Sequence, residues 1–173
     1  MNDRVELARA RRAVEAEQQA VSGILILLEV GGREALLIRL GADGGIHRLG
    51  SGSIETMERD RFIGITDPET FHQLLSKATP ALMEWCGQSR SHPSPRGDLC
   101  ELVISFKRAD GEESKMAWRY GSHSKWPPPE VLEFVAAAVE ATRPWYENEK
   151  RRMRLQAERA EYDWWEFFTQ PHA

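Results

Sequence analysis

The fold of this chain is decided by residues 99–142, LCELVISFKRADGEESKMAWRYGSHSKWPPPEVLEFVAAAVEAT. Alternating apolar residues predict one strand over Leu99–Lys107 and another over Ser114–Tyr120, joined by a turn that ends in Asp110-Gly111. Three prolines then stop the sheet and begin a helix that runs to about Thr142. The stretch is therefore a hairpin followed by a helix.

Residues 36–85 repeat this order of elements. Ala42-Asp43-Gly44 matches Ala109-Asp110-Gly111, and Arg48–Ser53 matches Arg119–Ser124. Both helices begin at a Pro-Glu pair. We interpret the two stretches as one hairpin-helix unit used twice, and the alternative is a chance likeness of common Asp-Gly turns.

The earlier part of the chain supplies more strands. Gly23–Val30 is almost wholly apolar and predicts a buried strand, which the glycine pair Gly31-Gly32 connects to a return strand over Glu34–Leu40. Leu37 lies on the opposite face from Leu36, Ile38 and Leu40, so that second face is expected to be at least partly covered. Further strands are predicted at Ile46–Leu49 and, as a short edge strand or a core plug, at Phe62–Ile65.

Helix signals follow the first strands. Thr66-Asp67-Pro68-Glu69 combines capping-box spacing with a proline in the first turn. Pro80 is expected to kink or divide the helix, with Thr79 as a second cap. Pro144 is expected to bend or end the later helix in the same way.

A single domain is predicted, because 173 residues suit one hydrophobic core. Residues 87–98, rich in glycine, serine and proline, show no periodicity and are predicted to be a linker. The predicted parts within 1–173 are an N-terminal helix (1–21), a first hairpin-helix unit (23–86), the linker (87–98), a second unit (99–143) and a C-terminal helical arm (144–173).

The element order α-βββ-α-ββ-α, followed by a charged C-terminal helix, predicts an α+β fold. A five-stranded, mainly antiparallel sheet with helices packed on one face is the natural arrangement of this order. Up to the last helix, the order of predicted elements resembles the fold of the type III secretion chaperones. That resemblance implies a small, acidic, dimeric protein that holds an unfolded segment of another protein.

Composition points to a soluble protein of ordinary type. The net charge of −4 gives no support for a surface built throughout to hold nucleic acid. The apolar runs are too short to span a bilayer, and Met1–Ala20 is charged rather than apolar, unlike a signal peptide. We therefore expect a cytoplasmic protein without membrane contact, with Cys86 and Cys100 reduced.

Familiar catalytic and cofactor motifs are missing from the sequence. The glycine-rich segments do not lead into a helix through a phosphate-binding lysine, and the cysteines and histidines lack metal-ligand spacing. Cys86 or Cys100 could form a nucleophile pair with His123, but both cysteines lie in apolar patterns that favour inert, buried thiols. We predict no enzyme activity, no cofactor and no metal.

Two polar segments are candidate binding sites. Arg48 with Ser51 and Ser53, and Arg119 with Ser122 and Ser124, could hold a phosphate or carboxylate through serine hydroxyls, glycine N–H groups and an arginine. The alternative is a strand that leaves the sheet through glycine and serine, with its arginine facing solvent.

The C-terminal aromatic residues form the strongest feature for binding. Five rings lie within seven residues, and exposed together they would make an aggregation-prone patch, so they are expected to dock on this sheet or on another chain. The candidate binding residues are Tyr162, Trp164, Trp165, Phe167, Phe168, Arg48, Arg119, His123 and Trp126.

Three functional interpretations result from the sequence. The first is a non-enzymatic protein-protein interaction module of the chaperone, immunity or assembly-factor type, which binds another protein or a second copy of itself. The second is a nucleic-acid-associated protein that uses the arginines of the first helix and Lys150–Arg154, with Trp126 or the terminal rings stacking on bases. The third is an unrecognised cysteine-dependent hydrolase.

Overall fold

A computed structural model describes residues 21–52 and 60–169 of the chain, with side-chain positions through Arg159. The predicted N-terminal helix therefore lies outside the described residues, except for Val21, which is the first residue of a strand.

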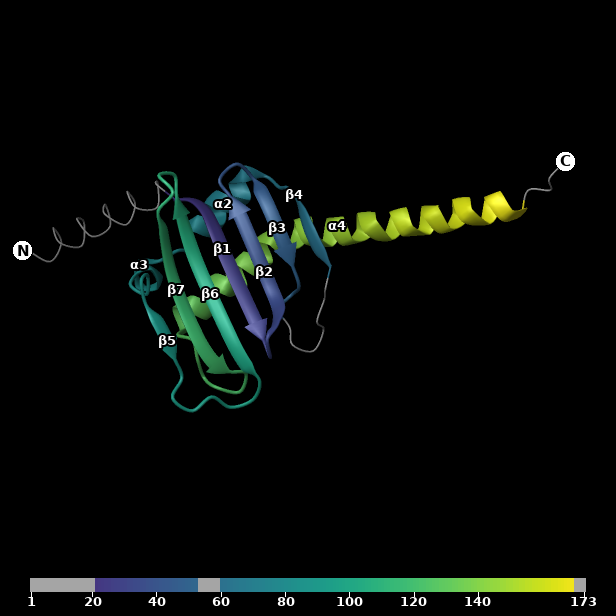
Figure 1. Ribbon diagram of the computed structural model, residues 1–173. Coiled ribbons are helices and arrows are strands. Elements are labelled where there is room, and N and C mark those ends of the chain that lie inside the picture. The colour runs from purple at the N-terminus through teal and green to yellow at the C-terminus, as the bar shows by residue number, and fades with distance from the viewer. Residues whose placement is uncertain (1–20, 53–59, 170–173) are drawn as a thin grey trace, which may run out of the picture.

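One seven-stranded sheet forms the centre of the molecule, with the strand order β4-β3-β2-β1-β6-β7-β5 (Figure 1). All neighbouring strands pair antiparallel except β5 and β7, which are parallel. The strands are β1 (Val21–Val30), β2 (Arg33–Gly41), β3 (Gly45–Leu49), β4 (Arg61–Ile65), β5 (Ser89–Ser91), β6 (Leu99–Arg108) and β7 (Glu113–Gly121).

The prediction of an α+β fold with a mainly antiparallel sheet is confirmed, but the number of strands was wrong. Phe62–Ile65 belongs to an edge strand, and the segment predicted as a linker contains β5. The exposed Ser-Arg-Ser of β5 carries no apolar alternation. Its backbone pairing with β7 therefore leaves no trace in the hydrophobic pattern.

Local sequence sets the turns and helix starts as expected. Gly31 and Gly32 have φ angles of 58° and 73°, which the two-residue turn between β1 and β2 requires. The side chain of Asp67 caps α2 (Pro68–Leu75), and that of Thr79 caps α3 (Pro80–Met83).

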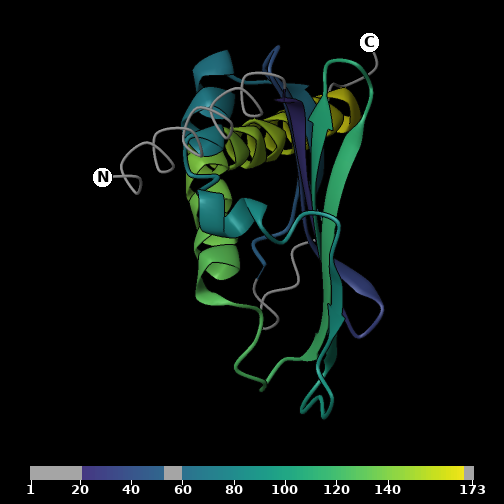
Figure 2. The same cartoon turned by 90° about the vertical axis from the view of Figure 1, so that its left-hand side faces the viewer.

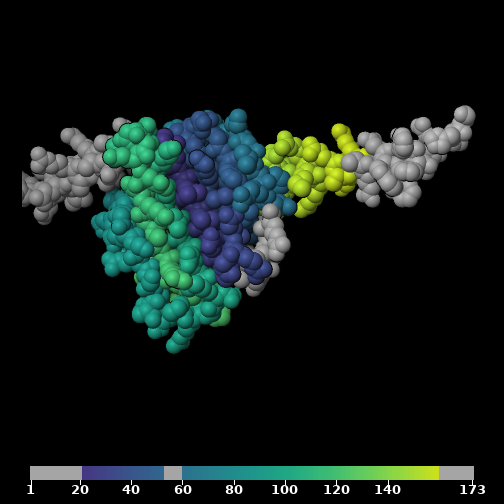
Figure 3. Space-filling view, in the orientation of Figure 1, coloured from purple at the N-terminus to yellow at the C-terminus, as the bar shows by residue number. Residues whose placement is uncertain are grey.

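The helices all lie on one face of the sheet, as predicted (Figure 2). The core forms between that face and the helices. Its largest fully buried apolar side chains include Trp118, Phe71, Phe106 and Phe134. The sheet's other face carries no helix in the described part of the chain, and Figure 3 looks directly onto it.

The last helix, α4, runs over Pro129–Thr169, so Pro144 lies inside the helix and does not end it. The predicted second unit and the predicted C-terminal arm therefore share one helix. Pro144 is exposed and costs a helix about 3 kcal/mol. Two residues later Tyr146 is 2 % exposed, and burial of its ring contributes roughly 4 kcal/mol, which exceeds that cost. Among the described helices, none has the combined length and apolar character needed to cross a membrane.

Candidate functional site

Tyr146 fixes α4 at the place where the helix leaves the sheet. Its hydroxyl accepts a hydrogen bond from the Gly50 N–H (3.1 Å) and donates one to the carbonyl of Asp60 (3.0 Å). The Arg48 guanidinium lies 5.0 Å from the ring centroid, and the Lys150 ammonium lies 5.2 Å from it. One side chain therefore joins α4 to the ends of β3 and β4.

Trp145 makes a second junction, with the edge strand β4. Its indole N–H donates to the carbonyl of Ile65 (3.0 Å), and its ring packs over Gly64. A Cβ at residue 64 would lie 3.0 Å from the Trp145 ring, so glycine makes this close approach possible.

Beyond Lys150, α4 projects away from the sheet past β4 (Figure 1). We call this part, Arg151–Thr169, the projecting segment. Residues 151–159 are all exposed, including Met153 at 53 % and Leu155 at 54 %. The predicted binding residues Tyr162, Trp164, Trp165, Phe167 and Phe168 all belong to this helical segment, beyond the described side chains. The sequence thus located a helical arm correctly but missed its continuity with α4.

The two arginines of the proposed repeat lie on opposite faces of the sheet. Arg48 is 1 % exposed and stacks on Tyr146 on the helix-covered face. Arg119 pairs with Glu101 (3.1 Å) on the uncovered face. Both hairpins are antiparallel and both helices share one face, but the expectation that these arginines are equivalent was wrong.

The polar groups of the second Arg-Gly-Ser segment brace a neighbouring loop. The hydroxyl of Ser122 accepts from the N–H of Asp98 (3.0 Å), and the hydroxyl of Ser124 accepts from the N–H of Arg96 (3.3 Å). In the first segment, the N–H of Gly52 donates to the carbonyl of Ala35. These hydrogen bonds belong to strands that leave the sheet, as the alternative to anion binding expected, but the buried Arg48 does not face solvent as that alternative also expected. Anion binding by the two segments stays a prediction.

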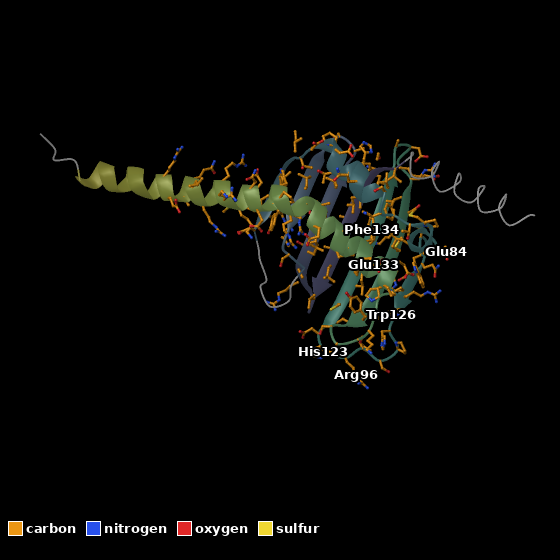
Figure 4. The ribbon with its side chains drawn as sticks, turned by 180° about the vertical axis from the view of Figure 1, so that it is seen from behind. Glu84, Arg96, His123, Trp126, Glu133 and Phe134 are labelled. Atoms are coloured by element: carbon orange, nitrogen blue, oxygen red, sulfur yellow. The ribbon has the colours of Figure 1, made fainter. Side chains whose placement is uncertain are left out.

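His123 and Trp126 lie near the start of α4, with Arg96 close by (Figure 4). His123 is exposed, whereas Trp126 packs against the core and lies edge-on to His92, with ring centroids 5.8 Å apart. The Trp126 ring is therefore engaged within the chain and does not form an open stacking surface.

The geometry of Cys100 does not favour the nucleophile that the third interpretation would require of it, and Cys86 is half-buried. Cys100 is 3 % exposed and its Sγ donates to the carbonyl of Asp98 (3.5 Å). Burial, with a further contribution from the Asp98 charge, raises the pKa of the Cys100 thiol. A nucleophilic cysteine needs the opposite shift.

The uncovered face of the sheet carries an apolar row that sequence reasoning did not identify as a site. Five side chains adjoin one another across neighbouring strands, each opposite the next in the sheet register. We call this row the apolar band: Leu49, Leu37, Leu27, Val103 and Ala117. The sequence contained one indication of this row. Leu37 lies on the opposite face from Leu36, and the second face of the sheet was therefore expected to be at least partly covered.

An open hollow of about 1030 Å³ lies on the same face, beside the apolar band. Gly23, Gly41 and Gly45 contribute no side chains to its floor, and His47 lies in its lining. Burial, reinforced by the charges of Arg61 and Arg39, lowers the pKa of His47. The hollow therefore contains a neutral imidazole at neutral pH.

Within residues 21–52 and 60–169, no three histidine, cysteine, aspartate or glutamate side chains gather as a metal site would require. No protein-family model matches the chain, and no curated protein or solved structure matches it. The resemblance to the fold of the type III secretion chaperones gains no support from these comparisons, and the described elements differ from the predicted order by the additional strands β4 and β5.

Proposed function

We propose that this protein is a non-enzymatic protein-protein interaction module, of the chaperone, immunity or assembly-factor type, that holds another protein through the projecting segment. The observation that carries the proposal is a helix continuing to Thr169 with residues 151–159 exposed. Five of the seven residues from Tyr162 to Phe168 in this segment are aromatic.

The sequence of the projecting segment favours a helical or groove-forming partner. Met153, Ala157, Ala160, Trp164 and Phe167 recur at alternating spacings of four and three residues. This is the spacing at which packed helices present a continuous seam, and small alanines allow close approach.

Energetics also favours a bound state for this segment. Most of the stability of a helix in a protein comes from packing of an apolar face, and residues 151–159 are all exposed. The ion pair between Arg152 and Glu149 supports the start of the segment. Large rings contribute binding free energy only when a partner removes them from water. The segment is therefore built to gain stability by docking.

Met153 and Leu155 provide a matched pair for the experiment, because they are almost equally exposed but lie on opposite sides of the helix. A partner is first recovered with the full chain from nuclease-treated host lysate and then purified. We expect Met153→Lys to weaken its binding at least tenfold and Leu155→Lys to change it less than threefold, measured by calorimetry.

Two outcomes would contradict the proposal. One is equal binding by both variants, which would show that the helix side carrying Met153 does not contact the partner. The other is capture that succeeds only from lysate without nuclease, with binding that weakens steeply as salt is added, which would favour the nucleic-acid interpretation instead.

A further inference from the structure

We infer that the uncovered face of the sheet is a homodimer interface, in which two copies stack face to face about a two-fold axis that runs along the apolar band. This site is distinct from the projecting segment. Four of the five side chains in the apolar band are only half-buried and would otherwise face water in the centre of the sheet, while Leu49 is already buried at the end of the band.

Charge on this face is arranged to fit a second copy. On one side of the band, neighbouring strands carry Glu34, Glu29 and Glu101. On the other side the strands carry Arg39, Lys115 and Lys107. A two-fold axis along the band exchanges the sides, so the cationic side of each copy meets the acidic side of the other.

Two charged residues on these strands lie on the side of the opposite charge, and both have a partner within the chain. Arg119, on the acidic side, pairs with Glu101, and Glu113, on the cationic side, accepts a hydrogen bond from the Ser105 hydroxyl. Glu34 also pairs with Arg61. Arg39 and Glu29 are therefore the sharpest test of complementarity between copies.

The shape of the face supports the same axis. Figure 2 shows the β1–β2 hairpin standing out on the uncovered side of the sheet. The glycine-floored hollow lies toward the opposite ends of these strands, where Gly23 pairs with Gly41. The two-fold operation places the protruding hairpin of each copy over the hollow of the other.

The available area is sufficient for a stable dimer. Four strands of nine or ten residues and two of five give a footprint of roughly 750 Å² per copy from strand rise and spacing. A standard interface buries about 800 Å² per partner. Sheets stack face to face with their strands within about 30° of each other, which preserves the contact across the band.

Leu27→Arg places a charge at the centre of the band, and Leu132→Arg is the matched control on the exposed side of α4. By light scattering coupled to size exclusion, we expect twice the 19.7 kDa chain mass for wild type and for Leu132→Arg. For Leu27→Arg the measured mass should equal that of one chain, and circular dichroism tests whether this variant is folded.

A charge exchange tests the axis without disturbing the apolar band. Arg39→Glu and Glu29→Arg should each weaken self-association at least tenfold, because each homodimer then sets like charges together. An equimolar mixture should form a heterodimer, since every such contact again joins opposite charges.

Three results would overturn the inference. A wild-type chain that is monomeric at all concentrations leaves the face to another occupant, such as the chain's own N-terminal residues or a foreign protein. If mixing Arg39→Glu with Glu29→Arg does not restore association, the proposed two-fold axis along the apolar band is excluded. A chain ending at Lys150 that becomes monomeric assigns self-association to the projecting segment, whereas loss of partner binding with dimerisation intact would leave this inference standing.

Discussion

At the scale of single residues, Tyr146 and Arg48 show how a polar pair can stabilise a core. The arginine is buried, but its charged plane lies over the tyrosine ring, whose hydroxyl bonds two backbone groups. The two hydrogen bonds satisfy the buried Tyr146 hydroxyl, and the ring lies against the buried guanidinium. The sequence identified Arg48 as a candidate binding residue. Its orientation toward the helices depends on Tyr146, which is distant in the sequence.

Tyr120 gives a pH-dependent prediction at this scale. Burial, with a smaller contribution from Cys100, raises the pKa of Tyr120 from 10.0 to about 12. Above pH 10 the unfolded chain loses this proton while the native chain keeps it. Stability should therefore fall as the pH rises from 10 to 12, by up to about 1.4 kcal/mol per pH unit.

The measurement is urea unfolding at pH 8, 10 and 11, comparing wild type with Tyr120→Phe. The variant should lose less stability over this range, because it has no phenol to ionise. Parallel losses in the two proteins would show that Tyr120 does not cause the alkaline destabilisation.

At the scale of elements, the junction between β4 and α4 depends on the absence of a side chain at residue 64. Gly64→Val should displace the Trp145 ring and break its bond to Ile65, at a cost of about 1–3 kcal/mol. Unfolding free energies measure this cost. In a Trp145→Ala background the same valine should cost far less, and equal costs in both backgrounds would refute the proposed clash.

The elements also show what sequence reasoning can and cannot reach. Strands β1, β2, β6 and β7 and the caps of α2 and α3 were predictable, because apolar alternation and local hydrogen bonds specify them. The short strand β5 was not, because only backbone pairing with β7 defines it. The continuity of α4 through Pro144 required knowledge of the tertiary contacts of Tyr146, which no local pattern contains.

At the scale of the whole molecule, the end of α4 projects away from the body formed by the sheet and its helices (Figure 1). A chain truncated after Glu161 should keep its free energy of unfolding within about 0.5 kcal/mol, since surface changes away from packed features have small effects. It should lose partner binding. Circular dichroism with urea, and calorimetry with the purified partner, test these two statements separately.

Outright unfolding of the truncated chain would place the aromatic residues in the core of the monomer. Unchanged binding would show instead that the aromatic residues are dispensable, and the proposed function would lose its main support. At this scale, one part of the candidate site could be predicted from the sequence and another part could not. The aromatic run is visible in the sequence, but the apolar band emerges only when five strands are set in register.

The anchoring of α4 at Trp145 and Tyr146 has a mechanical consequence. From Tyr146 to Thr169 the helix measures about 35 Å at 1.5 Å per residue, so it acts as a lever with its pivot at β4. A rotation of roughly 10° at the pivot moves the tip by about 6 Å over that length. Force applied by a partner at the tip is thereby transmitted as torque to the outermost strand of the sheet.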